Sequence, residues 1–397
     1  MAVTSAGRTG DDAAKASFLY RPEVRQIIYQ VVLALALIMF FYTIVTNAAE
    51  NMRRLNIASG LGFWNRTSGF DIGQHLVPYS ATSTYGDAFW VGMLNTLLVA
   101  AIGIVLATII GFLVGVGRLS SNWLVARLCT VYVELLRNMP LLLQLFFWYF
   151  AVLKVLPQAR QALELPGGSF LSNRGLNLPA PVAEAGLGYV GIALLAGVAL
   201  SIAVGMWARR RRLLTGQPFP VLWSTVGLAV LMPLVVALIL GRPMSFDYPV
   251  KGTFNFTGGI VVTPEFLALL FGLSLYTASF IAEIVRAGIL AVSKGQKEAA
   301  AALGLQPSQA LRLVVVPQAM RIVIPPLTSQ YLNLTKNSSL GLAIAYPELV
   351  SVTGTMLNQT GQAVEIILMV MGVYLTLSLL TSAFMNWFNS RVALVER

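Results

Sequence analysis

The chain has 397 residues, of which 57% are hydrophobic and only 11% are charged. A soluble domain carries about a quarter charged residues, so this composition excludes a soluble enzyme and indicates a protein lying largely in lipid. The single cysteine and single histidine exclude an internal disulfide and a protein-only zinc site of the usual kind. The net charge of +11 is more typical of an orientation signal than of nucleic-acid binding, and no nucleic-acid partner is expected.

Long runs without Asp, Glu, Lys or Arg predict the transmembrane helices, because a helix needs about 20 apolar residues to cross the hydrocarbon core. Two spans contain charges and prolines, notably Pro140 and Pro325-Pro326. These two are predicted to be broken, since breaks are tolerated where protein lines them. We expect an all-α integral membrane protein with about eight transmembrane helices, near residues 27–46, 88–117, 123–156, 187–207, 221–241, 264–290, 312–345 and 364–388.

The distribution of Lys and Arg predicts the orientation. They are more numerous in the segments on the side of the N-terminus than in the loops on the other side. The run Arg209–Arg212 is the strongest anchor, chiefly as a stop-transfer signal and secondarily as a contact for anionic lipid. Both termini are therefore expected in the cytoplasm. The long outer loops are either a cap that touches a partner or short ordered linkers.

Charged side chains inside the predicted spans must face protein or water, since lipid disfavours them strongly. Glu134 with Arg137, and Glu283 with Arg286, are spaced as i,i+3 neighbours on one helix face. Both are predicted to be structural ion pairs near the cytoplasmic side, with a role in gating as the alternative.

The segment 291–317 predicts a short helix, a turn and a second helix between two spans. Ser293 and Gln296 have the spacing of a capping box, and an alanine-rich helix follows to about residue 303. Gly304 stands where a left-handed residue ends a helix, and Pro307 suits the first turn of the next. Such a thin helix fits a groove on another protein; an ordinary amphipathic loop helix is the alternative.

The spacing in this segment resembles the EAA loop of ABC importer permeases, which reads EAA-x3-G-x9-I-x-L-P. The matching residues are Glu298, Ala299, Ala300, Gly304 and Pro317, with valine at both aliphatic positions. Residues 134–145 and 275–289 are similar to the polar amino-acid subfamily, and the extra helices resemble the longer permeases of bacterial general L-amino-acid transporters.

The resemblance implies a type I ABC importer permease core with an extra N-terminal helix and a two-helix insertion. It divides the chain into a cytoplasmic tail (1–26), a first helix with its periplasmic loop (27–87) and the first part of the core (88–156). The insertion (157–263), the second part of the core with the coupling loop (264–390) and a second cytoplasmic tail (391–397) follow.

The resemblance also implies partners: ABC ATPase subunits, a second homologous permease in a heterodimer, and a periplasmic amino-acid-binding protein that delivers an L-amino acid. The expected location is the bacterial inner membrane. The chain lacks a G-x-x-x-x-G-K-[ST] phosphate loop, so we expect it to be no enzyme and to bind no cofactor, with ATP and Mg held by the partner ATPase.

A polar string within the seventh span is the candidate substrate pathway. It comprises Asn333, Lys336, Asn337, Ser338 and Ser339, and it resembles the pathway-lining stretch of the family. Relatives selective for cationic amino acids tend to carry an acid where Asn337 stands, so this chain is expected to have broad selectivity. The alternative is that these groups satisfy one another across helices.

Two other functions remain open from the residues. An ion-coupled secondary transporter also uses broken helices, although no matching halves are seen. An intramembrane enzyme that needs an imidazole would have to use His75, which lies in a predicted outer loop and reads more simply as a surface residue.

Overall fold

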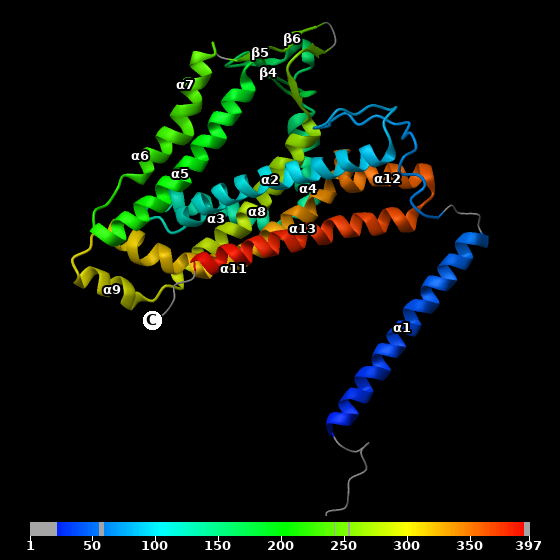
Figure 1. Ribbon diagram of the computed structural model, residues 1–397, viewed down its shortest axis with the longest axis horizontal. Helices are drawn as coiled ribbons and strands as arrows, with labels where there is room; N and C mark the ends of the chain where they lie inside the picture. Colours follow the sequence, from blue (N-terminus) through cyan, green and yellow to red (C-terminus); the bar gives the residue numbers. More distant parts are fainter. Residues whose placement is uncertain (1–21, 55–58, 242, 253–254, 393–397) are drawn as a thin grey trace, which may run out of the picture.

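The computed structural model describes residues 22–54, 59–241, 243–252 and 255–392. It is mainly helical (Figure 1). In the described residues, seven helices are long and apolar enough to cross a membrane, or eight if one bent pair counts as a span. The predicted helical membrane fold with about eight spans is thereby confirmed. The first helix, α1 (Pro22–Arg54), stands apart from the other helices in Figure 1.

The centre of the molecule is the parallel pair α2 (Tyr85–Gly117) and α8 (Pro264–Leu290). Glycines let the two backbones meet: a Cβ on Gly111 would lie 2.6 Å from Ile281, and one on Gly115 would lie 2.7 Å from the Ala282 carbonyl oxygen. Such close approach is how small residues join helices in lipid. The short helix α9 (Lys294–Ala302) follows α8 and marks one end of the molecule, called the α9 end below.

The predicted break at Pro140 is present. Helix α3 (Trp123–Asn138) is followed by α4 (Leu141–Phe146) and the π-helical segment η2 (Phe147–Leu153), bent by 109°. Gln144 donates through Nε2 to the carbonyls of Leu136 (2.9 Å) and Met139 (3.1 Å). Those carbonyls lie at the open end of α3, so the side chain satisfies acceptors that the break would otherwise expose.

The expected break at Pro325-Pro326 is wrong. Helix α11 (Val316–Asn337) runs through both prolines, with α10 (Pro307–Ala310) and the π-helical η5 (Leu311–Val315) before it. The helix changes instead at η6, a 3-10 segment (Ser338–Ile344), and turns at Ala345, whose φ is +60°. Prolines remove hydrogen bonds, yet protein surroundings let a transmembrane helix continue past them.

Helix α12 (Leu349–Thr360) was not anticipated; α13 (Ala363–Val392) follows it. Glu348 is fully buried and caps α12, accepting from the backbone N–H groups of Val350 (2.8 Å) and Ser351 (2.7 Å). A carboxylate in this role replaces the helical partners that the first N–H groups lack. The sequence did not indicate this helix, because residues 345–363 are polar and the helix is too short for a span.

The loop 59–84 packs onto the core at the end opposite α9. Phe63, Ile72 and Tyr79 share one buried cluster with residues of α12. Asn95 of α2 donates through Nδ2 to the Gln74 carbonyl at 2.8 Å, which fixes the loop. The Tyr79 and Ser68 hydroxyls form a hydrogen bond (2.8 Å), and burial raises the pKa of Tyr79. This loop is an ordered part of the fold.

Residues 157–263, predicted to be an insertion and called the insertion below, contribute a helical hairpin that leans away from α2, α8 and α13 (Figure 1). It consists of α5 (Leu187–Thr215), α6 (Val221–Val226), the π-helical η4 (Gly227–Leu231) and α7 (Met232–Ile239). Its two arms touch at Gly197, where an added Cβ would lie 2.0 Å from the Leu228 carbonyl oxygen.

The predicted outer loops of the insertion contain small antiparallel sheets, which the sequence reasoning missed. They define the sheet end of the molecule, opposite the α9 end. One sheet has the order β1-β2-β3-β8, and two pairs join β4 with β5 and β6 with β7. A 3-10 turn, η3 (Ala159–Gln161), precedes the strands. The strands are β1 Leu163–Leu165, β2 Ser169–Ser172, β3 Gly175–Leu178, β4 Ala180–Ala183, β5 Met244–Asp247, β6 Val250–Lys251, β7 Phe256–Thr257 and β8 Ile260–Val262.

Candidate coupling segment and transport pathway

The predicted helix-turn-helix at 291–317 is present. The N–H of Gly304 donates to the Ala301 carbonyl (2.9 Å) and that of Leu305 to the Ala300 carbonyl (3.1 Å), and Gly304 has φ +75°. This is the glycine-ended stop that the sequence indicated. Pro307 begins α10 as expected. The turn therefore has a fixed shape set by one glycine.

The expected capping box is wrong, because the Ser293 side chain makes no cap hydrogen bond. Gln296 instead accepts through Oε1 from Gln318 Nε2 at 3.0 Å. This contact ties α9 to the first turns of α11. The side chain that was expected to cap its own helix thus holds α9 against α11.

The five residues matched to the EAA pattern do not all face the same way. Glu298, Ala299, Gly304 and Pro317 are exposed, whereas Ala300 is only 3% exposed. One alanine thus packs α9 against the protein while its neighbours offer a thin, open face. The arrangement suits a helix that inserts into a groove of another subunit; the coupling role itself stays a prediction.

The polar string lies at the junction of α11 and η6. Asn333 and Lys336 are exposed, Asn337 is half-buried, and these three share one helix face by their i, i+3, i+4 spacing. Ser338 is buried and donates to the Thr335 carbonyl (2.7 Å), and Ser339 donates to that of Lys336 (2.8 Å). Both serines thus bond backbone carbonyls of their own segment, while a helix face with a lysine requires protein or water beside it.

Of the two expected ion pairs, the structure contains one. Arg286 donates to Glu283 at 2.6 Å, and Arg118 at the end of α2 also donates to Glu283. Glu134 and Arg137 form no ion pair within 4 Å, both being described residues. Arg137 lies over the Phe280 ring instead, 5.1 Å from its centroid, because α3 packs against α8 there. The predicted Glu134–Arg137 pair is therefore corrected.

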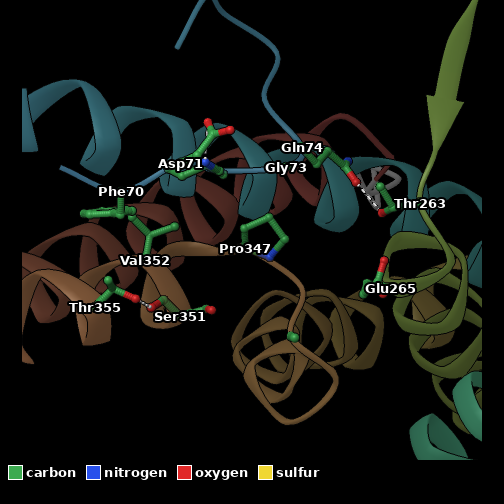
Figure 2. A pocket seen from close by; sticks show the side chains of 12 residues that line it. Phe70, Asp71, Gly73, Gln74, Thr263, Glu265, Pro347, Ser351, Val352 and Thr355 are labelled. Carbon is green, nitrogen blue, oxygen red and sulfur yellow. Dashed lines mark hydrogen bonds between the residues drawn. The ribbon is translucent and has the colours of Figure 1, made fainter. Parts of the chain in front are cut away.

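A cavity of about 290 Å³ lies at the sheet end, between loop 59–84, the start of α8 and the start of α12. Figure 2 shows Gln74 and Thr263 on one side, Ser351 and Thr355 on another, and Pro347 between them. The Thr263 hydroxyl donates to Gln74 Oε1 at 2.8 Å. Ala345, with its positive φ, also lines the cavity, so the strained turn faces it.

Sequence reasoning missed this cavity entirely. Its residues come from three segments that are far apart in the chain, and no motif links them. The polar string does not line it. The one available signal was the polar stretch after residue 345, which lies between two predicted spans. His75 is exposed in loop 59–84 with its Nδ1 2.9 Å from the Val77 carbonyl, which fits a surface residue.

Comparison with known proteins places the chain in a family. The profile described as "Binding-protein-dependent transport system inner membrane component" matches residues 197–394. The general L-amino acid transport system permease protein AapQ of Rhizobium johnstonii is 57% identical, over 96% of this chain and 95% of its own length. The putative amino-acid ABC transporter permease protein YhdX of Escherichia coli is 47% identical, over 95% and 96%.

Two further proteins are similar. The glutamate/glutamine/aspartate/asparagine transport system permease protein BztB of Rhodobacter capsulatus is 40% identical, over 97% of this chain and 99% of its own. A solved amino acid ABC transporter with histidines is 18% identical with a TM-score of 0.46, covering 77% of this chain and 95% of that one. The chain therefore belongs to the family of binding-protein-dependent transport system inner membrane components, the permease subunits of ABC importers, in the branch of these long relatives.

Proposed function

We propose that this chain is a permease subunit of an ATP-driven importer of L-amino acids, with both termini in the cytoplasm. A periplasmic binding protein delivers the amino acid, and separate ATPase subunits bind ATP and Mg at the α9 end. A second, homologous permease completes the pathway. The inner membrane of a bacterium is the proposed location, and the amino-acid substrates rest on the names of the relatives.

The observation that carries the proposal is the open face of α9. Glu298 and Ala299 are exposed, while Ala300 and the Gln296–Gln318 hydrogen bond hold the helix on the span behind it. A helix fixed on one side and thin on the other transmits motion from a partner that grips it. Closing ATPases would move α9 and, through α8 and α11, the pathway.

Gly304→Asp and Glu298→Lys test the coupling role in proteoliposomes that contain the whole transporter. Both variants are expected to lose ATP-driven uptake while the permease remains folded. Gly216→Asp is the matched control, because Gly216 is also a left-handed helix-ending glycine (φ +72°) but belongs to the insertion. Normal uptake and normal ATPase association in both α9 variants would contradict the proposal. Uptake that ignores ATP and collapses with an ionophore would favour an ion-coupled carrier.

A further inference from the structure

A second cavity, of about 460 Å³, lies at the sheet end where the insertion meets the core. The core supplies Lys154, at the end of η2, and Glu265, in the first turn of α8. The insertion supplies Asn173, Arg174 and Asn255. Most of these groups are polar or charged, so the cavity is built for a polar ligand rather than for lipid.

The turn that carries Arg174 is held in place on both sides. The Asn173 N–H donates to the Pro157 carbonyl at 2.9 Å, beyond the end of η2. Gly175 has φ +113°, and a Cβ there would lie 2.2 Å from the Val262 carbonyl oxygen. Leu176 pairs with Val262 between β3 and β8, just before α8 begins. The β2–β3 turn is thus fixed above the junction of two core spans.

The charges of this cavity leave one cation uncompensated. Glu265 accepts from the Tyr149 hydroxyl at 2.7 Å and lies 3.5 Å from Lys154 Nζ, so it balances the lysine. In the described part of the chain, no acidic side chain comes within 4 Å of the Arg174 guanidinium. Arg174 is an exposed residue that lines this polar cavity without a carboxylate of its own, and a guanidinium in that position can bind a carboxylate from outside.

We propose that this cavity is an outer binding site for the carboxylate group of an amino acid, with Arg174 as its principal contact. The inference rests on the proposed function. The site lies beside the first cavity, since Thr263 and Glu265 line both. The insertion thereby gains a role, which is to supply the cation.

The test measures binding of radiolabelled L-glutamine to the purified transporter in nanodiscs, without the binding protein. Arg174→Gln is expected to weaken binding about tenfold, as for loss of a charge-assisted hydrogen bond, and Arg174→Lys by less than about threefold. Arg160→Gln, a change at another exposed arginine of the same insertion, is the matched control and leaves binding unchanged. 4-Aminobutanamide, which is glutamine without its α-carboxylate, is expected not to compete.

Three results would overturn the site. They are absence of glutamine binding to the wild-type complex, equal binding by wild type and Arg174→Gln, or full competition by 4-aminobutanamide. A further result, unchanged glutamine binding with a higher concentration of binding protein needed to stimulate ATPase activity, would assign Arg174 to a protein contact instead. ATP-driven uptake of L-amino acids by the wild type is measured in parallel. Absence of that uptake would contradict the proposed function, independently of the binding result.

Discussion

The core pair α2 and α8 and the insertion hairpin α5–α7 pack in different ways. In the core, Gly111 and Gly115 bring two long helices into backbone contact, and two thirds of the residues in the most apolar stretch of α8 are buried. In the hairpin, the two arms contact mainly each other, and almost no residue in the most apolar stretch of 221–239 is buried. The difference teaches that close backbone contact fixes the core helices to one another, whereas the hairpin packs mainly on itself.

The largest expected effect comes from filling the core contact. Gly111→Val would place its side chain against Ile281 and is expected to destabilise the protein by at least about 1–3 kcal/mol, the usual cost of overpacking. Thermal unfolding in detergent measures it. Gly205→Val on α5, where nothing lies within 4 Å of an added Cβ, is the control and should behave as wild type. Equal loss in both variants would break the comparison.

Glu283 offers the next test. Glu283→Gln leaves Arg118 and Arg286 without their shared carboxylate and is expected to cost about 1–3 kcal/mol of stability. Glu134→Gln removes a negative charge that forms no ion pair, so the melting temperature of this variant should match that of the wild type. A larger effect at Glu134 than at Glu283 would overturn the reassignment of Arg137 to the Phe280 ring.

Asn337→Asp sharpens the assignment of the pathway. An added carboxylate on the half-buried face of α11 is expected to shift uptake from neutral toward cationic amino acids by roughly fivefold, the value of about 1 kcal/mol. Competition between radiolabelled arginine and glutamine measures the shift. Ser339→Asp serves as the comparison. An unchanged profile in Asn337→Asp would remove this residue from the pathway.

The smallest expected effect concerns the tether of α9. Gln318→Leu removes a hydrogen bond whose net value is about 0.5–1.5 kcal/mol, so stimulated ATPase activity should fall only partly. Gln217→Leu deletes a hydrogen bond to Arg211 in the hairpin and should leave coupling intact. If both variants reduce coupling equally, the tether has no special role.

The helices were predictable because lipid demands long charge-free runs, and the sequence shows them directly. The Gly304 turn was predictable for a different reason, since one residue type fits its backbone angle. Helix α12 was not predictable, because its twelve residues are too short and polar for a span. The strands escaped notice because each has at most four residues and β3 pairs with β8, more than eighty residues later.

The candidate sites divide along the same line. The coupling segment is continuous in sequence, so its pattern was visible. The two cavities at the sheet end gather residues from loop 59–84, the insertion, α8, α12 and the end of η2, and only the folded chain brings them together. The Glu134–Arg137 pair failed because spacing alone says nothing of the aromatic ring that α8 presents to Arg137.

The most direct measurement of the central claim uses the single native cysteine. With Cys129→Ser as background, Ala299→Cys on α9 and Leu214→Cys at the exposed end of α5 are compared in the intact transporter. A short thiol-to-amine cross-linker is expected to join Ala299→Cys to the ATPase subunit and to block ATP-driven uptake, while Leu214→Cys gives neither result. Cross-linking at Leu214→Cys but not at Ala299→Cys would contradict the assignment of α9 as the coupling helix.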